Sequence, residues 1–196
     1  MNDIESSVRN FLPRMIKGKE VELTRAKREA ISKWSLKTMM MFQCAHPREH
    51  QTLISKCDYQ RFRTLGSPSA SMQIWVATMD PPRLAGQIEH AVEFIAIPLQ
   101  AKGPDGLSLE TPAYTASLRI GHFAAQVIQV DGGPHGGRLI IKPNKVLAKF
   151  VLGTWPAAGQ RTKNWPPPGK LNEMGNFDYF ARVLATPGEL HAKHGD

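Results

Sequence analysis

With 196 residues, of which 41% are apolar and 21% charged, the chain is long enough for one domain with a sizeable core, and this composition excludes global disorder. The net charge of +8 is uneven, since residues 1–65 contain 13 Lys and Arg against 7 Asp and Glu, so we expect a surface that attracts phosphates or acidic proteins. Two cysteines, an N-terminus without a basic and apolar leader, and no apolar run of roughly 20 residues predict a cytoplasmic protein without a disulfide framework, signal peptide or membrane helix.

A first helical segment is predicted over residues 4–16. Its apolar side chains recur with a helical period and fall along one face, as in an amphipathic helix. Pro13 lies inside this pattern and removes a backbone donor, so we expect a kink or a break into two short helices there. Gly18 supplies the stop.

A second, longer helix is predicted to follow. Thr24 is a suitable N-cap, and the helix should extend to about Cys44. Its apolar face widens toward the C-terminal end until nearly every side is apolar, which indicates that this end lies in the core. A third, weaker helix is expected at 47–64, before the turn-forming residues 66–69.

Beyond this turn the period changes from that of a helix to that of a strand. Residues 72–78 alternate as a strand does, and Pro81 and Pro82 close the run. Further strands, separated by turns rich in glycine and proline, are expected at 91–99, 112–119, 122–130 and 138–142. The glycine-rich residues 131–137 are interpreted as a long hairpin loop between the last two of these strands.

The C-terminal third has weaker patterns. Residues 145–152 fit either a last strand or a short helix. The prolines after Trp155 and within 165–168 fix φ and remove donors, so we expect an extended segment that wraps the surface. A final short helix is expected at 177–185, and residues 187–196 should form a flexible tail.

Helices first and consecutive strands afterwards predict an α+β fold. In this fold the N-terminal helices pack on one face of an antiparallel sheet, and a short helix follows near the C-terminus. We expect a single domain over residues 1–186. It would comprise a helical part, a β-rich part and a Pro-rich wrap with the last helix, at 1–65, 72–152 and 153–186.

Four side chains with metal-ligating atoms lie close together in the sequence: Cys44, His46, His50 and Cys57. Zinc accepts two Cys and two His, and the spacing of the two histidines suits one face of a helix. However, neither cysteine belongs to a Cys-x-x-Cys pair, and Pro47 lies between the histidines. The alternative is a buried Cys44 that ends an apolar helix, with surface histidines opening the next. We favour this alternative and predict no bound metal or cofactor.

No complete catalytic constellation is recognised. Glu49 and its neighbouring histidines share the content of a metal-dependent nuclease motif, but a second histidine-bearing hairpin is missing, and a capping role for Glu49 is the better interpretation. The glycines of 131–137 precede a predicted strand rather than a helix, unlike those of a phosphate-binding loop. His122 and His135 are isolated in the sequence. An enzyme is therefore the less favoured prediction.

Basic residues of the second predicted helix are candidates for nucleic-acid contact. Lys37 lies in the most apolar part of this helix, where an unpaired ammonium is costly to bury. In a functional interpretation Lys37 contacts phosphates together with Arg25, Arg28 and Lys33. In a structural interpretation, which we prefer, the apolar stem of Lys37 is buried and its ammonium reaches solvent at the helix edge.

Several short motifs occur in a characteristic order. They are Met1-Asn2-Asp3-Ile4-Glu5, an arginine-rich amphipathic start with Pro13, Trp34-Ser35-Leu36-Lys37-Thr38, Ile74-Trp75-Val76, Ile120-Gly121-His122-Phe123 with Gln126-Val127, and Trp155-Pro156 with Trp165-Pro166-Pro167. In this order they resemble the C-terminal region of uncharacterised HNH-endonuclease-type proteins from bacteria and their phages. The resemblance covers most of the chain.

The resemblance implies a region that follows a cysteine-rich HNH module, whose last element reads Cys-Asn-x-Gly-Trp-Met. The chain begins at the methionine of this element, so we expect the nuclease cysteines and histidines to be missing, either because the gene product is naturally shortened or because its start was assigned late. Matched position by position, only two parts of the family pattern carry over to this chain. They are the surroundings of Trp34, Lys37 and Thr38, and the turn at Gly121.

Three functions follow as hypotheses. The first is a non-catalytic accessory module that binds DNA or RNA through its basic N-terminal helices. The second is a protein-interaction module, in which the Trp-Pro segments and the Met-rich helix dock a partner or a second copy in a homodimer. The third, which we hold lowest, is a metal-dependent hydrolase with a split site.

Overall fold

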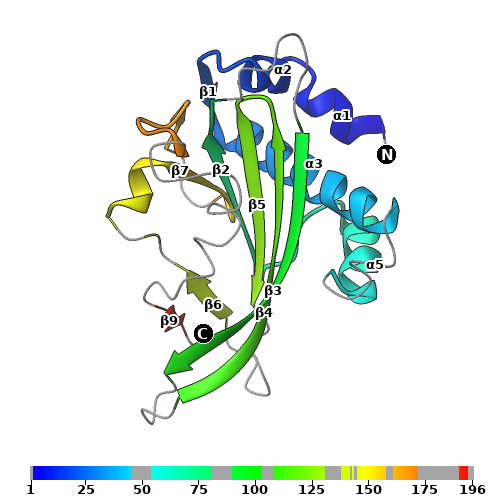
Figure 1. Ribbon diagram of the computed structural model, residues 1–196. Helices are drawn as coiled ribbons and strands as arrows, with labels where there is room; N and C mark the ends of the chain where they lie inside the picture. The colour runs from blue at the N-terminus through cyan, green and yellow to red at the C-terminus, as the bar shows by residue number, and fades with distance from the viewer. Residues whose placement is uncertain are drawn as a thin grey trace.

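The computed structural model describes residues 2–45, 54–80, 90–102, 108–130, 138–141, 143, 145–157, 161–171 and 190–193. Within these residues, helices cover one face of a five-stranded antiparallel sheet (Figure 1). This arrangement confirms the predicted α+β class with N-terminal helices.

The predicted break near Pro13 is present, and it lies just before the proline. The chain forms α1 (Asn2–Val8) and α2 (Leu12–Ile16). Pro13 occupies the first turn of α2, where the helix does not need its missing N–H. The apolar face of this segment is buried at Val8, Phe11, Leu12 and Met15.

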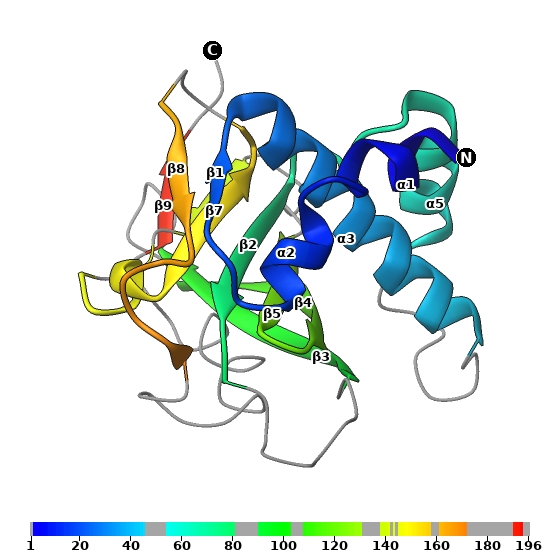
Figure 2. The same ribbon diagram turned by 90° about the horizontal axis from the view of Figure 1, so that it is seen from above.

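The central helix is α3 (Arg25–Ala45), which crosses the sheet, as Figure 2 shows. The Thr24 hydroxyl accepts a hydrogen bond from the Lys27 N–H at 3.3 Å, so the predicted N-cap is confirmed. The side of α3 that faces the sheet is buried at Ile31, Leu36, Met39 and Met40. The C-terminal half of this helix is buried on one side only, since Met41 is 58% exposed, so the expectation of burial on nearly every side is wrong.

Near the C-terminal end of α3 lies a further helix, α5 (Lys56–Leu65). Ser55 caps its start by accepting a backbone hydrogen bond. Gly66, at φ +61°, ends it in the left-handed conformation that favours glycine. The helix predicted at 47–64 is therefore present in its second half, whereas residues 46–53 lie outside the described part.

The main sheet has the order β3–β4–β5–β2–β7, and each neighbouring pair is antiparallel. Its strands are β2 (Met72–Thr78), β3 (His90–Lys102), β4 (Ser108–Ile120), β5 (Phe123–Val130) and β7 (Val151–Trp155). The strands predicted at 72–78, 91–99, 112–119 and 122–130 are thus confirmed, although β3 and β4 are longer than expected.

A tight turn between β4 and β5 fastens the sheet to the end of α2. Gly121 adopts φ +55° in this turn, and a Cβ atom there would lie 2.7 Å from the Ile16 carbonyl oxygen. The His122 N–H donates to the same oxygen at 2.9 Å. The left-handed backbone and the close approach together explain why glycine stands at this position.

Two small sheets lie beside the main one. In the first, β1 (Val21–Leu23) pairs with β8 (Lys163–Trp165), and in the second, β6 (Arg138–Ile141) pairs with β9 (Leu190–Lys193). The predicted hairpin between 122–130 and 138–142 is wrong, because β5 pairs with β4 and β2 instead. Within the tail expected at 187–196, the described residues Leu190–Lys193 form β9, and the rest lie outside the described part.

The C-terminal third is more deeply packed than a surface wrap. Residues 145–152 contain both alternatives, a short 3-10 helix η2 (Leu147–Lys149) followed by the start of β7. Trp165, which was expected on an extended surface segment, is 1% exposed and packs 5.8 Å from Phe123, measured between ring centroids. The helix predicted at 177–185 lies outside the described residues.

The core has two parts, one on each face of the sheet. The larger lies between the helices and the sheet and includes Met15, Leu36, Phe123 and Trp165. The smaller lies on the opposite face and is formed by residues in or next to β2, β5, β7, η2 and the Pro-rich segment: Ala77, Met79, Ile128, Leu147, Val151 and Leu171. The segment after β7 therefore contributes to both.

Candidate nucleic-acid interface

The four basic residues predicted to contact phosphates do not share one surface. Arg28 is 2% exposed, and its guanidinium donates to the Arg161 carbonyl oxygen at 3.4 Å. Lys37 is 8% exposed and forms an ion pair with Glu5 of α1. Both are buried by segments that are distant in sequence, so neither is placed to reach a phosphate.

The other two candidates remain accessible. Arg25 is exposed and pairs with Glu29 one turn along α3, with 2.9 Å between Nε and Oε1. Lys33 is half-buried on the same helix. Of the four candidates, only Arg25 and Lys33 are therefore accessible on α3, and Arg25 has Glu29 beside it.

The residues singled out by the resemblance lie in different places. Trp34 is half-buried and meets Phe123 of β5 edge to face, with ring centroids 6.1 Å apart. Lys37 and half-buried Thr38 lie further along α3. Gly121 forms the turn that contacts α2. These positions support the packing of α3 between α1, α2 and the sheet.

The candidate zinc ligands are not brought together in the described residues. Cys44 and Cys57 are exposed thiols, and the expectation that Cys44 is buried is wrong. Cys44 Sγ lies 3.6 Å from the Tyr59 hydroxyl, and burial, followed by this contact, raises the pKa of Tyr59. His46 and His50 lie outside the described part, in which no three His, Cys, Asp or Glu side chains form a metal-binding group.

Two other segments, far apart in the sequence, also carry an excess of positive charge. Residues 9–27 contain six Lys and Arg against two Glu, and residues 161–170 contain three Lys and Arg and no acid. These segments thus hold net charges of +4 and +3 out of the total of +8. The sequence signal for the second segment was present but was overlooked beside its prolines and tryptophan.

Pairing of β1 with β8 joins the two segments. Figure 2 shows β8, β1, α2 and α1 following one another along one side of the molecule. Five exposed side chains project from these elements and their connections, and we call them the basic strip: Arg9, Arg14, Lys17, Lys19 and Arg161.

The backbone of the strip is fixed by the alternation of β1 and by local hydrogen bonds. Val21 and Leu23 point into the core, while Glu22 between them is exposed. The Arg14 guanidinium donates to the Glu20 carbonyl at 2.9 Å, and the Lys27 ammonium donates to the Glu22 carbonyl at 3.0 Å. Arg14 of the strip and Lys27 outside it thus hold the backbone that follows Lys17 and Lys19.

Behind the strip, Lys163 anchors β8 to the main sheet. Its ammonium donates to the Gly153 carbonyl of β7 at 3.1 Å. Burial, and secondarily the charge of Arg28, lower the pKa of Lys163. Lys163 and Arg28 therefore act mainly in packing, and the contact with a ligand is left to the exposed cations in front of them.

A second charged cluster lies at the end of β2. Lys170 contacts both carboxylate oxygens of Asp80, at 3.0 and 3.1 Å, and His122 Nδ1 lies 3.7 Å from the same carboxylate. These side chains come from the Pro-rich segment, β2 and the turn after β4. Ion pairs of this kind at a partly exposed site add little to stability, and we interpret the cluster as a fastening between elements.

Comparison with known proteins finds no matching family model, no similar curated protein and no similar solved structure. In the part of the chain that the structure describes, no helix combines the length and apolar character needed to cross a membrane. Function therefore has to be inferred from the chemistry of the basic strip.

Proposed function

We propose that the protein is a non-catalytic module that binds nucleic acid through the basic strip. The observation that carries this proposal is the β1–β8 pairing, which brings together two segments with net charges of +4 and +3. The proposal keeps the ligand class predicted from the sequence and moves the contact from α3 to the strip.

The chemistry of the strip suits a phosphate backbone better than a single small anion. Its cations are exposed and lie on α2, on the connections at either end of α2, and just before β8, so they can neutralise several phosphates at once. Such contacts release condensed counterions and position a strand without reading its bases. We therefore expect binding that depends strongly on salt.

The test compares two triple variants that remove the same charge from opposite ends of the molecule. The first, Lys17→Gln with Lys19→Gln and Arg161→Gln, neutralises the strip. The control neutralises three exposed cations of α5, which lies away from β8 in Figure 2: Lys56→Gln, Arg61→Gln and Arg63→Gln. Fluorescence anisotropy with a labelled single strand and a duplex, each of about 20 nucleotides, is measured across a salt series.

We expect the strip variant to bind at least about tenfold more weakly at low salt, and its slope of log affinity against log salt to fall by about 2. The control variant should keep most of the affinity and most of the salt dependence of the unmodified protein. Equal losses in the two variants would show that binding follows net charge alone, and absence of binding by the unmodified protein at low salt would refute the proposal.

Catalysis forms no part of this proposal. As an accessory module of the HNH-related type, the chain would hold nucleic acid without cutting it. Divalent-dependent cleavage of DNA or RNA by the purified protein would therefore favour the hydrolase instead.

A protein-interaction module is the second candidate, and strand β3 favours it. This strand of 13 residues lies at one end of the main sheet and pairs along its length with β4. Val92, Phe94 and Ile95 on it are half-buried. A strand of a second copy could add to such an edge, although Pro98 within β3 lacks the N–H that continuous pairing needs.

A further inference from the structure

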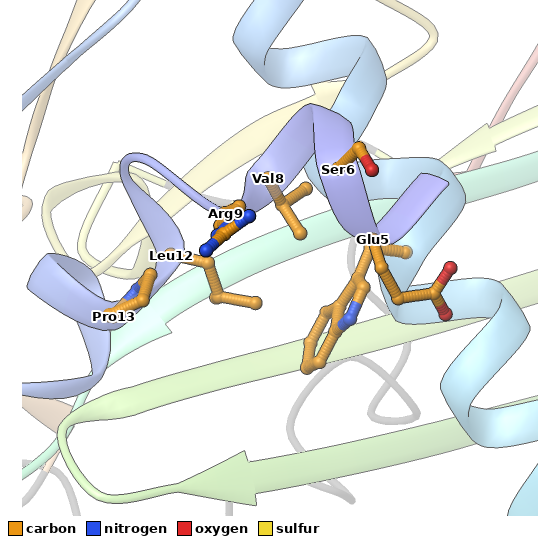
Figure 3. Close-up of a pocket in the computed structure, with 7 residues that line it drawn as sticks. Glu5, Ser6, Val8, Arg9, Leu12 and Pro13 are labelled. Carbon is orange, nitrogen blue, oxygen red and sulfur yellow. The ribbon is translucent and has the colours of Figure 1, made fainter. Parts of the chain in front are cut away.

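An open hollow of about 490 Å³ lies where α1, α2 and α3 meet (Figure 3). Its volume is within the range of about 300–1,000 Å³ that is common for small-ligand sites. The side chains that define its chemistry are Glu5, Val8, Arg9, Leu12 and Trp34. None of them was grouped with the others in the sequence analysis.

The wall of the hollow is apolar and includes one aromatic ring. Val8 and Leu12 are almost fully buried. The Trp34 indole is held from the sheet side by Phe123 at a ring angle of 67°, and its partial exposure leaves indole surface open to the hollow. A fixed indole beside aliphatic side chains favours a planar, aromatic ligand group.

The rim of the hollow carries one charge of each sign. Figure 3 shows Glu5 on α1 and Arg9 just after its last residue, Val8, which lies between them. Glu5 pairs with Lys37, so its carboxylate is fixed in the ionised form, which accepts several hydrogen bonds. Arg9 is exposed and belongs to the basic strip.

We infer that this hollow takes one unpaired nucleobase from a single strand whose backbone follows the basic strip. Trp34 stacks with the base, Glu5 accepts a hydrogen bond from its exocyclic amine, and Arg9 contacts an adjoining phosphate. The inference rests on the proposed function and makes it specific, because a base stacked within a duplex is not available to such a site. Cytosine and adenine carry the required amine next to the ring, whereas thymine does not.

The first test of the pocket replaces Trp34. Trp34→Leu keeps an apolar side chain and removes the stacking surface, and Trp34→Phe restores an aromatic ring. We expect Trp34→Leu to weaken binding of a single strand of about 12 nucleotides by about 5- to 100-fold, and Trp34→Phe to recover most of this loss. The affinity for a duplex should change by less than about twofold in both variants, because a base stacked within a duplex cannot enter the hollow.

The second test does not depend on how Trp34→Leu folds. The unmodified protein should bind oligo(dC) about 5- to 10-fold more tightly than oligo(dT). Glu5→Leu, which removes both acceptor oxygens, should abolish this preference while total binding remains. Equal affinity for the two oligonucleotides in the unmodified protein would overturn the base pocket.

The two proposals fail in distinguishable ways. If the strip variant loses binding while Trp34→Leu and Glu5→Leu behave like the unmodified protein, the strip binds nucleic acid and the base pocket is refuted. If the unmodified protein binds no single strand at low salt, both proposals are refuted together.

Discussion

Lys37 shows how a cation is accommodated in the most apolar helix of the chain. Its ammonium reaches α1 and pairs with Glu5, whose side chain is half exposed. This differs from the preferred expectation that the ammonium would reach solvent alone. A buried lysine with a carboxylate partner avoids the cost of an isolated charge, although such a pair adds modest net stability when one member faces water.

The Glu5 carboxylate should make stability depend on pH in the acid range. Its pKa in the folded protein lies below the usual 4.5, chiefly because of the hydrogen bond from Lys37. A carboxylate with a depressed pKa stabilises the fold above its unfolded pKa, and this contribution is lost as the pH falls through the folded value. We expect Glu5→Gln to cost about 0.2–1 kcal/mol near neutral pH, discounted for the exposure of Glu5.

Urea unfolding at a series of pH values measures this difference. The two proteins should converge as the pH falls below the usual carboxyl range, toward about pH 3. A difference that stays constant over this range would show that Glu5 contributes by packing rather than by charge.

At the scale of elements, the contact between the β4–β5 turn and α2 depends on one glycine. Gly121 and Gly66 both have positive φ, at +55° and +61°. They differ in their surroundings, because a Cβ atom at Gly121 would meet the Ile16 carbonyl whereas nothing lies within 4 Å of the same atom at Gly66. The two positions therefore separate backbone strain from steric exclusion.

We expect Gly66→Ala to cost about 1–2 kcal/mol from the left-handed backbone alone. Gly121→Ala should cost about 1–3 kcal/mol more, since the turn must also move away from α2. Thermal and urea unfolding of the two variants check this order. Equal losses of unfolding free energy in the two variants would mean that the turn moves without cost and that the close contact with Ile16 does not add to the effect of the backbone.

The short strands also show where sequence patterns stop being informative. The N-cap at Thr24 and the strand at 72–78 were predicted correctly, because a helix cap and an alternating strand leave local signals in the sequence. The strand β1 has three residues and pairs with another three-residue strand about 140 positions away, so no local period marks either. Burial of Arg28 and Lys37 was missed for the same reason, since their partners come from distant segments.

At the scale of the whole molecule, the same limit explains which part of the candidate site was predictable. The excess of positive charge in the first third was visible in the composition, and it supported the class of ligand. The location was not visible, because the strip arises from pairing of Val21–Leu23 with Lys163–Trp165. The Trp34 hollow likewise depends on how α1 and α2 lie against α3.

The oligomeric state decides between the two candidate functions at this scale. Since Pro98 interrupts the donors along the edge strand β3, we expect the protein to be a monomer with a mass of 21.8 kDa in light scattering. A stable species of twice this mass would favour the protein-interaction module. In that case, substitution of β3 residues rather than of the basic strip should alter the measured mass.

The pairing of β1 with β8 has a consequence for biosynthesis. While the ribosome is still translating the middle of the chain, Val21–Leu23 have emerged and their partner has not been made. The cations around the early strand are then attached to an unfinished polypeptide without a fixed arrangement. If the basic strip binds nucleic acid as proposed, its full affinity should therefore arise only once Trp165 has left the exit tunnel and β8 can pair with β1.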